Sequence, residues 1–295
     1  MSPKSFKRLK PYLFLLPALF FLAVFTYFPI LNAFKTSLFK LNLDFPKGEF
    51  AWFENYRILL ASSTFRQVIS NSLFYSFSTI IIGFTLSLFL AIQLDKNIKL
   101  KGFYKVILFY PTMIPMAAAA LIWMWIFMPM YGVLDYYLGK LGFASHNWLN
   151  DPNLALGCLV VVGVWKRLGY YVLFFLAGLQ NIPSSLNEAA TIDGANPVQR
   201  FFVITLPMIS SFSFFVFITS IIDSLQAVDQ VYIMTQGGPF ESTNLLVYYI
   251  YENGFKYWNR GLGSAMTSVL TIFLLIVTVV IFKTVGKKVY YESER

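Results

Sequence analysis

Long apolar runs dominate this sequence and limit the folds that it can adopt. Six segments each hold about 20 or more mainly apolar residues, the length at which a helix crosses a hydrocarbon layer of roughly 30 Å. These segments are residues 11–34, 70–94, 103–129, 154–179, 203–225 and 264–284. We therefore expect an all-α integral membrane protein with six transmembrane helices, embedded in membrane lipid.

Composition supports a membrane protein and argues against nucleic-acid binding. Only 13% of the residues are charged and 57% are hydrophobic, whereas a soluble chain carries about 25% charged residues. The net charge of +9 comes from cations at the ends of apolar runs, so it fits membrane orientation better than a nucleic-acid surface. We expect one membrane domain over residues 1–295 and no nucleic-acid partner.

The distribution of cations predicts the orientation in the membrane, because cytoplasmic loops carry an excess of Lys and Arg. The cations that set this bias are Lys4, Lys7, Arg8 and Lys10 before the first run, Lys96, Lys99, Lys101 and Lys105 between the second run and the start of the third, and Lys283, Lys287 and Lys288 at the end of the last run and beyond it. Both termini are thus expected in the cytoplasm. Counting spans places residues 180–202 on the same side.

Residues for metal, disulfide or nucleotide chemistry are scarce. Cys158 is the sole cysteine and lies within an apolar run, and His146 is the sole histidine. A lone histidine makes a poor metal site, and no G-x-x-x-x-G-K-[ST] loop for a nucleotide triphosphate occurs. No nucleophile–base cluster is evident, so we do not expect an enzyme or a bound metal.

Residues 183–202, between the fourth and fifth runs, predict a short helix, a tight turn and a second helix. Ser185 followed three residues later by Glu188 predicts a capping box at the start of the first helix. This helix is expected over Leu186–Asp193, and Gly194 can end it in the left-handed conformation. A helix of about eight residues is marginal in water, so it must dock on its own spans or on a partner.

The second helix of this loop has its own start signal. Asn196 is a good N-cap, and Pro197 suits the first turn that follows. On the first helix, Leu186, Ala189 and Ala190 share one face at spacings of three and four. The two small alanines permit close approach by another surface.

The same residues resemble the EAA loop of permease subunits of bacterial binding-protein-dependent ABC importers. That motif reads Glu-Ala-Ala, three residues, Gly, nine residues and Ile-x-Leu-Pro, and the matching residues are Glu188, Ala189, Ala190, Gly194, Ile204, Leu206 and Pro207. Further stretches are similar to the carbohydrate-uptake branch, especially the maltose-type and glycerol-3-phosphate-type permeases. They are PYLFLLPALFF at 11–21, FENYRILL at 53–60, YPTMIPMAAAALIWMWIF at 110–127, VWKRLGYYVLFFLAGLQNIP at 164–183 and TQGGPFEST at 235–243.

The resemblance implies a place in a larger assembly in the bacterial cytoplasmic (inner) membrane. Its expected partners are a second homologous permease subunit, two copies of a P-loop ATPase and an extracytoplasmic substrate-binding protein. ATP and magnesium would be held by the ATPases, with no cofactor in this chain. The residues implied to couple to an ATPase are Glu188, Ala189, Ala190, Asp193 and Gly194. The implied cargo is a sugar, an oligosaccharide or a polyol phosphate, moved by alternating access.

Lys166 and Arg167 lie near the middle of the fourth run, where charged side chains are costly unless they face a cavity or a partner. They are candidates for the substrate path. The alternative is a structural role, as an ion pair with Asp223 or in contact with backbone carbonyls. By resemblance, Tyr170 falls at a position that contacts sugar in the maltose-type family.

The fifth run adds polar side chains within two helical turns. Carboxylate, amide and hydroxyl groups suit sugar hydroxyls, and aromatic rings such as Trp165 and Tyr170 suit the apolar face of a sugar. The polar candidates are Ser220, Asp223, Ser224 and Gln226. The serines are alternatively expected to hydrogen-bond between helices.

Two questions stay open from the sequence. Gly237, Gly238 and Pro239 form an external turn that, by resemblance, lies beside the substrate-binding protein, or serves only as a turn. The alternative function is a secondary transporter or channel that needs no ATPase. It is disfavoured because no internal six-span repeat is evident and the loop at 183–202 is so sharply specified.

Overall fold

The computed structural model describes residues 14–96 and 98–284. These residues group into two compact units, one of residues 14–62 with Ile250–Phe273 and one of residues 63–249 with 274–284. The expectation of a single domain over residues 1–295 stays a prediction. The terminal cations Lys4, Lys7, Arg8, Lys10, Lys287 and Lys288 lie outside the described residues.

Four of the predicted spans are confirmed as long apolar helices. They are the helix Phe14–Thr36, which contains a π-helical turn at Ala23–Tyr27 and ends in α2 (Phe28–Thr36), and then α4 (Ser63–Asp95), α8 (Ala155–Gln180) and α14 (Arg260–Thr284). Each is long enough to cross a hydrocarbon core of roughly 30 Å.

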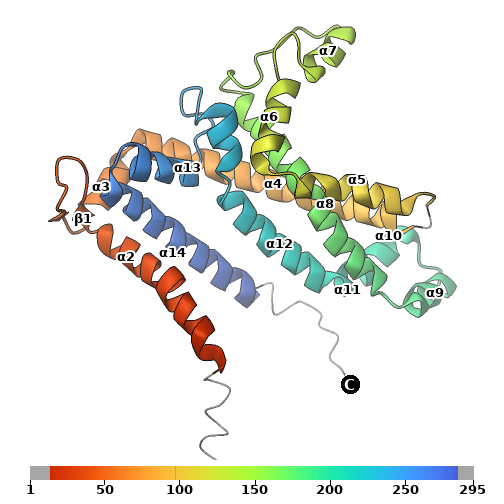
Figure 1. Cartoon of the computed structure of the whole chain (residues 1–295). Helices are drawn as coiled ribbons and strands as arrows, with labels where there is room; N and C mark the ends of the chain where they lie inside the picture. The colour runs from red at the N-terminus through yellow and green to blue at the C-terminus, as the bar shows by residue number, and fades with distance from the viewer. Residues whose placement is uncertain (1–13, 97, 285–295) are drawn as a thin grey trace, which may run out of the picture. The chain divides into compact units, whose positions relative to one another are not determined.

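The third predicted span, residues 103–129, is not one straight helix. It consists of α5 (Lys101–Met113) and α6 (Met116–Ile126), which are bent by 103° relative to each other (Figure 1). Ile114 between them is extended, with ψ 132°, because a residue that precedes a proline avoids the helical region. Pro115 therefore breaks the span that the apolar run predicted as continuous.

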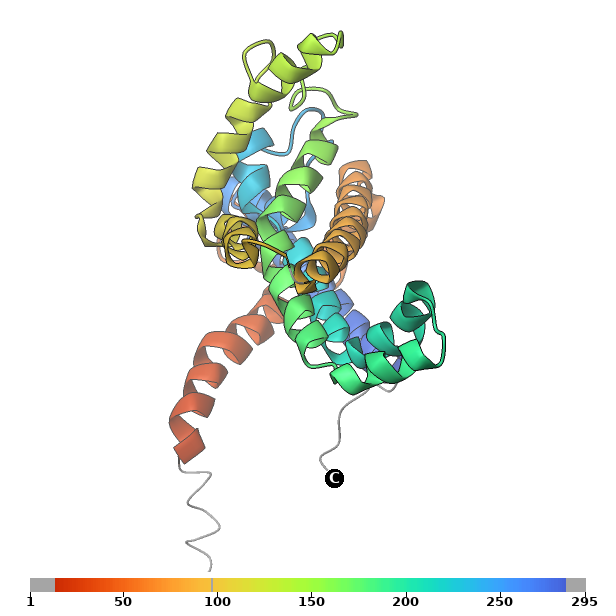
Figure 2. The same cartoon turned by 90° about the vertical axis from the view of Figure 1, so that its right-hand side faces the viewer.

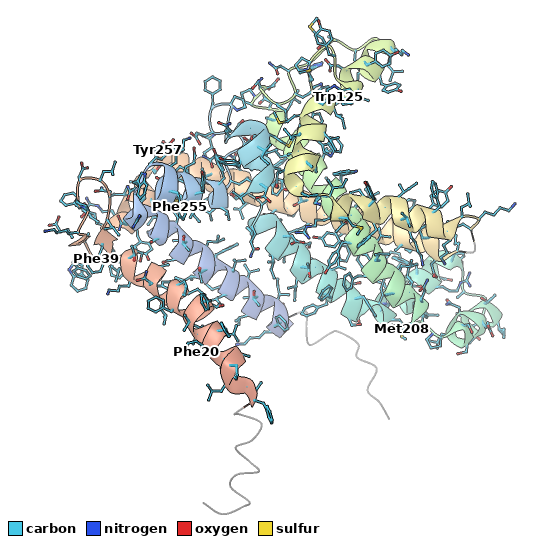
Figure 3. The ribbon with its side chains drawn as sticks, viewed as in Figure 1. Phe20, Phe39, Trp125, Met208, Phe255 and Tyr257 are labelled. Carbon is cyan, nitrogen blue, oxygen red and sulfur yellow. The ribbon has the colours of Figure 1, made fainter. Side chains whose placement is uncertain are left out.

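The fifth predicted span, residues 203–225, is also bent, by 70°. Its first part comprises α10 (Pro197–Arg200), a π-helical turn (Phe201–Thr205) and α11 (Leu206–Met208), and its second part is α12 (Ser210–Leu225). Proline within this run cannot donate to the helical ladder, and kinks gather at prolines and π-turns. Met208, labelled in Figure 3, lies at this corner.

The first unit contains a small polar anchor besides its helices. Strands β1 (Phe39–Lys40) and β2 (Glu49–Phe50) pair antiparallel and lead into α3 (Glu54–Ala61). The buried amide of Asn55 donates to the carbonyls of Ser37, at 2.8 Å, and Phe39, at 2.9 Å. One side chain thus ties α3 to the start of the hairpin.

The first helix presents an apolar surface along its whole length. The 18-residue stretch of Phe14–Thr36 with the highest hydropathy has 0% of its residues buried. Phe20, labelled in Figure 3, is 57% exposed. An apolar surface of this extent fits lipid or another subunit as its surroundings.

The second unit is built on α8, which packs along α4, α5 and α12 (Figure 2). Its buried core includes Val172, Phe175 and Leu176 from α8 and Ile209 and Val216 from the fifth run.

The remaining short elements come from both units. They are α7 (Val133–Lys140), α9 (Ser184–Ile192), α13 (Leu246–Tyr251) and π-helical turns at Val231–Thr235 and Glu252–Lys256.

The segment around α7 is held together by one carboxylate. Asp135 is buried and accepts hydrogen bonds from the amide of Met130 at 2.8 Å, from the indole of Trp148 at 2.6 Å and from the hydroxyl of Ser145. The bond from Ser145, supported by that from Met130, lowers the pKa of Asp135 from 3.8 to about 2.

Candidate translocation cavity and coupling loop

A polar cavity of about 200 Å³ lies within the second unit, between α4, α8 and α12. Most of the predicted path residues line it, and they are Lys166, Arg167, Ser220, Asp223, Ser224 and Gln226. Residues from two segments more than 50 positions apart in sequence therefore meet around one space. Polar groups at this depth are expected to face a cavity.

An ion pair crosses the cavity. The guanidinium of Arg167 lies 3.0 Å from Oδ1 of Asp223, and the phenol of Tyr171 donates to Oδ2 at 3.1 Å. The carboxylate thus has a partner on each oxygen, which offsets the cost of removing it from water. The side chain of Arg167 is 45% exposed, so part of the guanidinium remains accessible.

Lys166 makes different contacts from its neighbour. Its ammonium donates to the carbonyls of Pro111 at 2.8 Å and Thr112 at 3.1 Å, and also to that of Ile114. All three carbonyls belong to the end of α5 and the break that follows it. The lysine lines the cavity while its charged end is held by backbone.

Two predicted path residues lie elsewhere. The ring of Trp165 packs on that of Trp123 with centroids 5.5 Å apart, and Tyr170 packs on Phe174 at 4.9 Å. Neither lines the cavity; Tyr171 does. The expected tyrosine is therefore displaced by one position, which turns it by about 100° around the helix.

The sequence reasoning missed the wall that α4 supplies. Tyr75 and Thr79 line the cavity, and the phenol of Tyr75 accepts a hydrogen bond from Gln230 at 2.8 Å. A Cβ on Gly163 would lie 2.3 Å from the Tyr75 hydroxyl, so this glycine makes room for the ring. The available signal was polar residues four apart in the second apolar run.

The serines of α12 bond within their own helix. Ser220 donates to the carbonyl of Phe217 at 2.7 Å and Ser224 donates to that of Ile221 at 3.0 Å. The alternative of hydrogen bonds between helices is therefore wrong for both. Both serines still line the cavity.

The loop at 183–202 forms the predicted pair of helices, with different caps. The expected capping box of Ser185 and Glu188 is wrong, because α9 begins at Ser184 after Pro183 and no side chain caps it. Proline supplies the helical start instead, since it has no amide hydrogen to satisfy. The capping box lies on α10, where Asn196 and Gln199 exchange hydrogen bonds of 2.9 Å.

The end of α9 is confirmed at a left-handed glycine. Gly194 has φ +79°, its amide bonds to the carbonyl of Thr191 at 3.1 Å, and the amide of Ala195 bonds to that of Ala190 at 2.9 Å. This pair of bonds is the Schellman pattern. Arg200 of α10 also donates to the hydroxyl of Thr191 at 2.9 Å, so the turn is fixed from both sides.

No residue of α9 is buried, and the helix stands apart from the long helices in Figure 2. Leu186 is 40% exposed and Ile192 87% exposed. The predicted coupling residues all lie on α9 or its terminal turn, and they are Glu188, Ala189, Ala190, Asp193 and Gly194. A short helix with an uncovered apolar face requires a docking surface.

The turn at 237–239 is ordered by contacts with α4. Gln67 donates to the carbonyl of Phe240 at 3.0 Å, and Asn71 donates to that of Glu241 at 2.7 Å. Gly237 has φ +82°, a conformation suited to glycine. The loop holds Phe240 86% exposed at its tip.

Comparisons of the sequence with a family model and with curated proteins indicate the same family. The model of the binding-protein-dependent transport system inner membrane component matches residues 83–289. The sn-glycerol-3-phosphate transport system permease protein UgpA of Pectobacterium atrosepticum is 36% identical over 286 residues, which cover 96% of each chain. The protein of the same name from Brucella abortus is 32% identical and covers 97% of each chain.

Solved structures show the same fold. A chain of a bacterial ABC transporter involved in the import of the acidic polysaccharide alginate superposes with a TM-score of 0.85 at 21% identity, covering 96% of this chain and 99% of that chain. A chain of an alginate ABC transporter in complex with an alginate pentasaccharide-bound periplasmic protein gives a TM-score of 0.83. This chain therefore belongs to the family of binding-protein-dependent transport system inner membrane components, as a multi-pass permease subunit of an ABC importer.

Proposed function

We propose that this permease lines half of the pathway for a small anionic polyol, such as a polyol phosphate. The observation that carries the proposal is Arg167, a partly exposed guanidinium in the wall of a polar cavity. The guanidinium fork binds phosphate and carboxylate oxygens in pairs. The relatives named for sn-glycerol-3-phosphate transport support the same class of cargo.

The lining of the cavity can exchange its internal partners for an anionic solute. The cavity within this subunit has a volume of about 200 Å³, and in the proposed pathway the second permease supplies the other half of the wall. An anionic group would replace the carboxylate of Asp223 beside Arg167, and the released carboxylate would accept hydrogen bonds from solute hydroxyls. Gln226 and the hydroxyl of Tyr171 add further polar groups.

The assembly that we propose has a second homologous permease, two P-loop ATPases and an extracytoplasmic substrate-binding protein. The uncovered face of α9 supports docking on an ATPase, with Glu188, Ala189, Ala190, Asp193 and Gly194 at or beside the contact. The turn of Gly237, Gly238 and Pro239 supports docking of the binding protein. A thousandfold accumulation of solute requires about 4 kcal/mol, which the ATPases supply.

ATP hydrolysis then takes place in the partner subunits, which bind ATP and magnesium. In this proposal the chain itself holds no cofactor and performs no catalysis. Both termini and α9 face the cytoplasm of a bacterial cell, and the turn at 237–239 faces outward. Lys96, Lys99, Lys101 and Lys105 support that orientation.

The cognate substrate-binding protein gives the sharpest test of the cargo. Its thermal unfolding would be followed with polyol phosphates, matched uncharged polyols, sugars and oligosaccharides. We expect stabilisation by a polyol phosphate and none by the uncharged polyol of the same length. Stabilisation by a neutral sugar alone would contradict the anionic class, while co-purification of this chain with a P-loop ATPase would still support the assembly.

A further inference from the structure

The break between α5 and α6 creates an electrostatic problem inside a membrane span. A helix leaves its last carbonyls without intrahelical partners, and such groups are costly where water is absent. Here α5 ends at Met113 and α6 begins at Met116 after a turn of 103°. The carbonyls at this end also carry the negative pole of the helix dipole.

The ammonium group of Lys166, on α8, supplies hydrogen-bond donors to these carbonyls, although it lies more than 50 positions away in sequence. A lysine ammonium has three donors and no acceptor. Its three acceptors are the carbonyls of Pro111, Thr112 and Ile114, with the first two at 2.8 and 3.1 Å. These contacts use the full donor capacity of the side chain.

The backbones of the two helices approach closely beside this contact. A Cβ on Gly169 would lie 1.9 Å from the carbonyl oxygen of Leu108, so only glycine allows the approach. In the reverse direction, the hydroxyl of Thr112 donates to the carbonyl of Lys166 at 3.3 Å. The end of α5 and the middle of α8 are therefore joined as one body.

We propose that Lys166 is a tethered cation that holds the third span in its bent form. Broken helices of secondary transporters use such carbonyl ends to coordinate a free cation, and here an ammonium fixed to the chain takes that place. The bend sets the position of α6 (Figure 1), and Met116 at the start of α6 lines the cavity. Lys166 is thus a positioning residue, and among the described residues that line the cavity Arg167 is the cation left to meet an anion.

This inference concerns the bend and does not depend on the identity of the cargo. Spin labels at Val106 of α5 and Leu121 of α6, which are 64% and 61% exposed, report the bend as a distance. The labelled permease is measured in the assembled importer in nanodiscs, without ATP or substrate. The variants are Lys166→Met, which keeps length without charge, and Lys166→Arg, which keeps charge. Lys105→Met on α5 is the matched control.

We expect one narrow distance distribution for the native lysine, for Lys166→Arg and for Lys105→Met. Lys166→Met should give a broader distribution with longer distances, because the carbonyls lose a charged donor. Its maximal uptake rate should fall about tenfold or more, the scale of hydrogen bonds to a charged group, with KM within about twofold. An unchanged distribution for Lys166→Met would overturn the proposal.

Chemical rescue separates the charge from mere packing. Lys166→Ala leaves space for a small cation, so methylammonium should narrow the distance distribution and restore uptake. Tetramethylammonium, which has no N–H donor, should do neither. If methylammonium has no effect on a Lys166→Ala complex that assembles normally, a tethered-cation role is refuted. Should Lys166→Met fail to assemble, washing methylammonium out of Lys166→Ala gives the same comparison.

Discussion

The cavity and the loop at 183–202 belong to the same unit but differ in how their polar and apolar groups are satisfied. In the cavity, Asp223 has Arg167 and Tyr171, and Lys166 has three carbonyls. In the loop, α9 has no buried residue. These charged groups of the cavity have their partners within this chain, whereas α9 has its apolar face open to another molecule.

The two regions therefore depend on different interactions for their function. A cavity with internal partners must exchange them for a solute, so its specificity depends on competition with the protein's own groups. The helix α9 needs only the correct backbone geometry at its terminal turn, because a partner would supply the contacts that cover its apolar face. The two regions are connected through α8, which contains Lys166 and ends at Gln180, shortly before α9 begins at Ser184.

The largest effect is expected from Gly194→Pro. The native φ of +79° is closed to proline, whose φ is near −65°, and the mismatch costs about 3 kcal/mol or more. We expect ATP hydrolysis stimulated by the binding protein to be abolished in reconstituted vesicles, while the complex still reaches the membrane. Gly194→Asn is the matched control, because asparagine tolerates the left-handed region, and it should retain most activity. Equal activity of both variants would remove the loop from the coupling mechanism.

Arg167→Gly should lower uptake by about tenfold or more without loss of basal ATP hydrolysis, because a charge-assisted contact is removed. The double variant Arg167→Gly with Asp223→Ser distinguishes two causes. If Arg167 serves only to neutralise Asp223, removing both charges should restore uptake. We expect no recovery, because the anion would still lack its cation. Recovery in the double variant would make the ion pair purely structural.

Asn71→Ala tests the turn at 237–239 with a smaller effect. Its amide donates to the carbonyls of Glu241 and Asn244, and each hydrogen bond is worth about 1 kcal/mol. Half-saturation of ATP hydrolysis by the binding protein should rise about three- to tenfold, with little change in the maximal rate. Thr85→Ala on the same helix, whose hydroxyl bonds only within α4, is the control and should leave half-saturation unchanged.

The smallest effect concerns the segment around α7. Because the pKa of Asp135 is lower in the folded chain, at about 2, than its ordinary 3.8, its stabilisation is complete above about pH 5 and is lost as the pH falls towards 2. Hydrogen exchange over residues 130–150, corrected for intrinsic rates, should accelerate in that window. Asp135→Asn should weaken the segment at neutral pH and abolish the acid dependence. Identical pH profiles for the two proteins would refute this assignment.

The extent of sequence-based prediction differed between the same two regions. Gly194 adopts a left-handed backbone conformation that suits glycine, and Asn196 caps the start of α10 with its side chain. Because both preferences are local, the turn and the second cap were predictable from the sequence. Ser185 and Glu188 satisfied a capping pattern, but Pro183 placed the helix start one residue before Ser185. Local signals compete, and the proline prevailed.

The cavity depends on contacts between distant segments, which periodicity does not specify. Tyr75 can line the cavity because Gly163, on the facing helix, leaves space for its ring. Nothing in the sequence around either residue predicts that the two are in contact. The choice of Tyr171 over Tyr170 depends on the rotation of α8, about 100° per residue. The bend at Pro115 was likewise concealed by an apolar run that continues across it.

The most direct test of the central claim is uptake into vesicles that contain the complete transporter, with the binding protein outside. An ion gradient is either imposed across the vesicle membrane or collapsed with ionophores, and ATP is either trapped inside or omitted. We expect accumulation of the radiolabelled cargo only with internal ATP and the binding protein, and none with Gly194→Pro. Accumulation driven by an ion gradient in the absence of ATP would contradict the central claim.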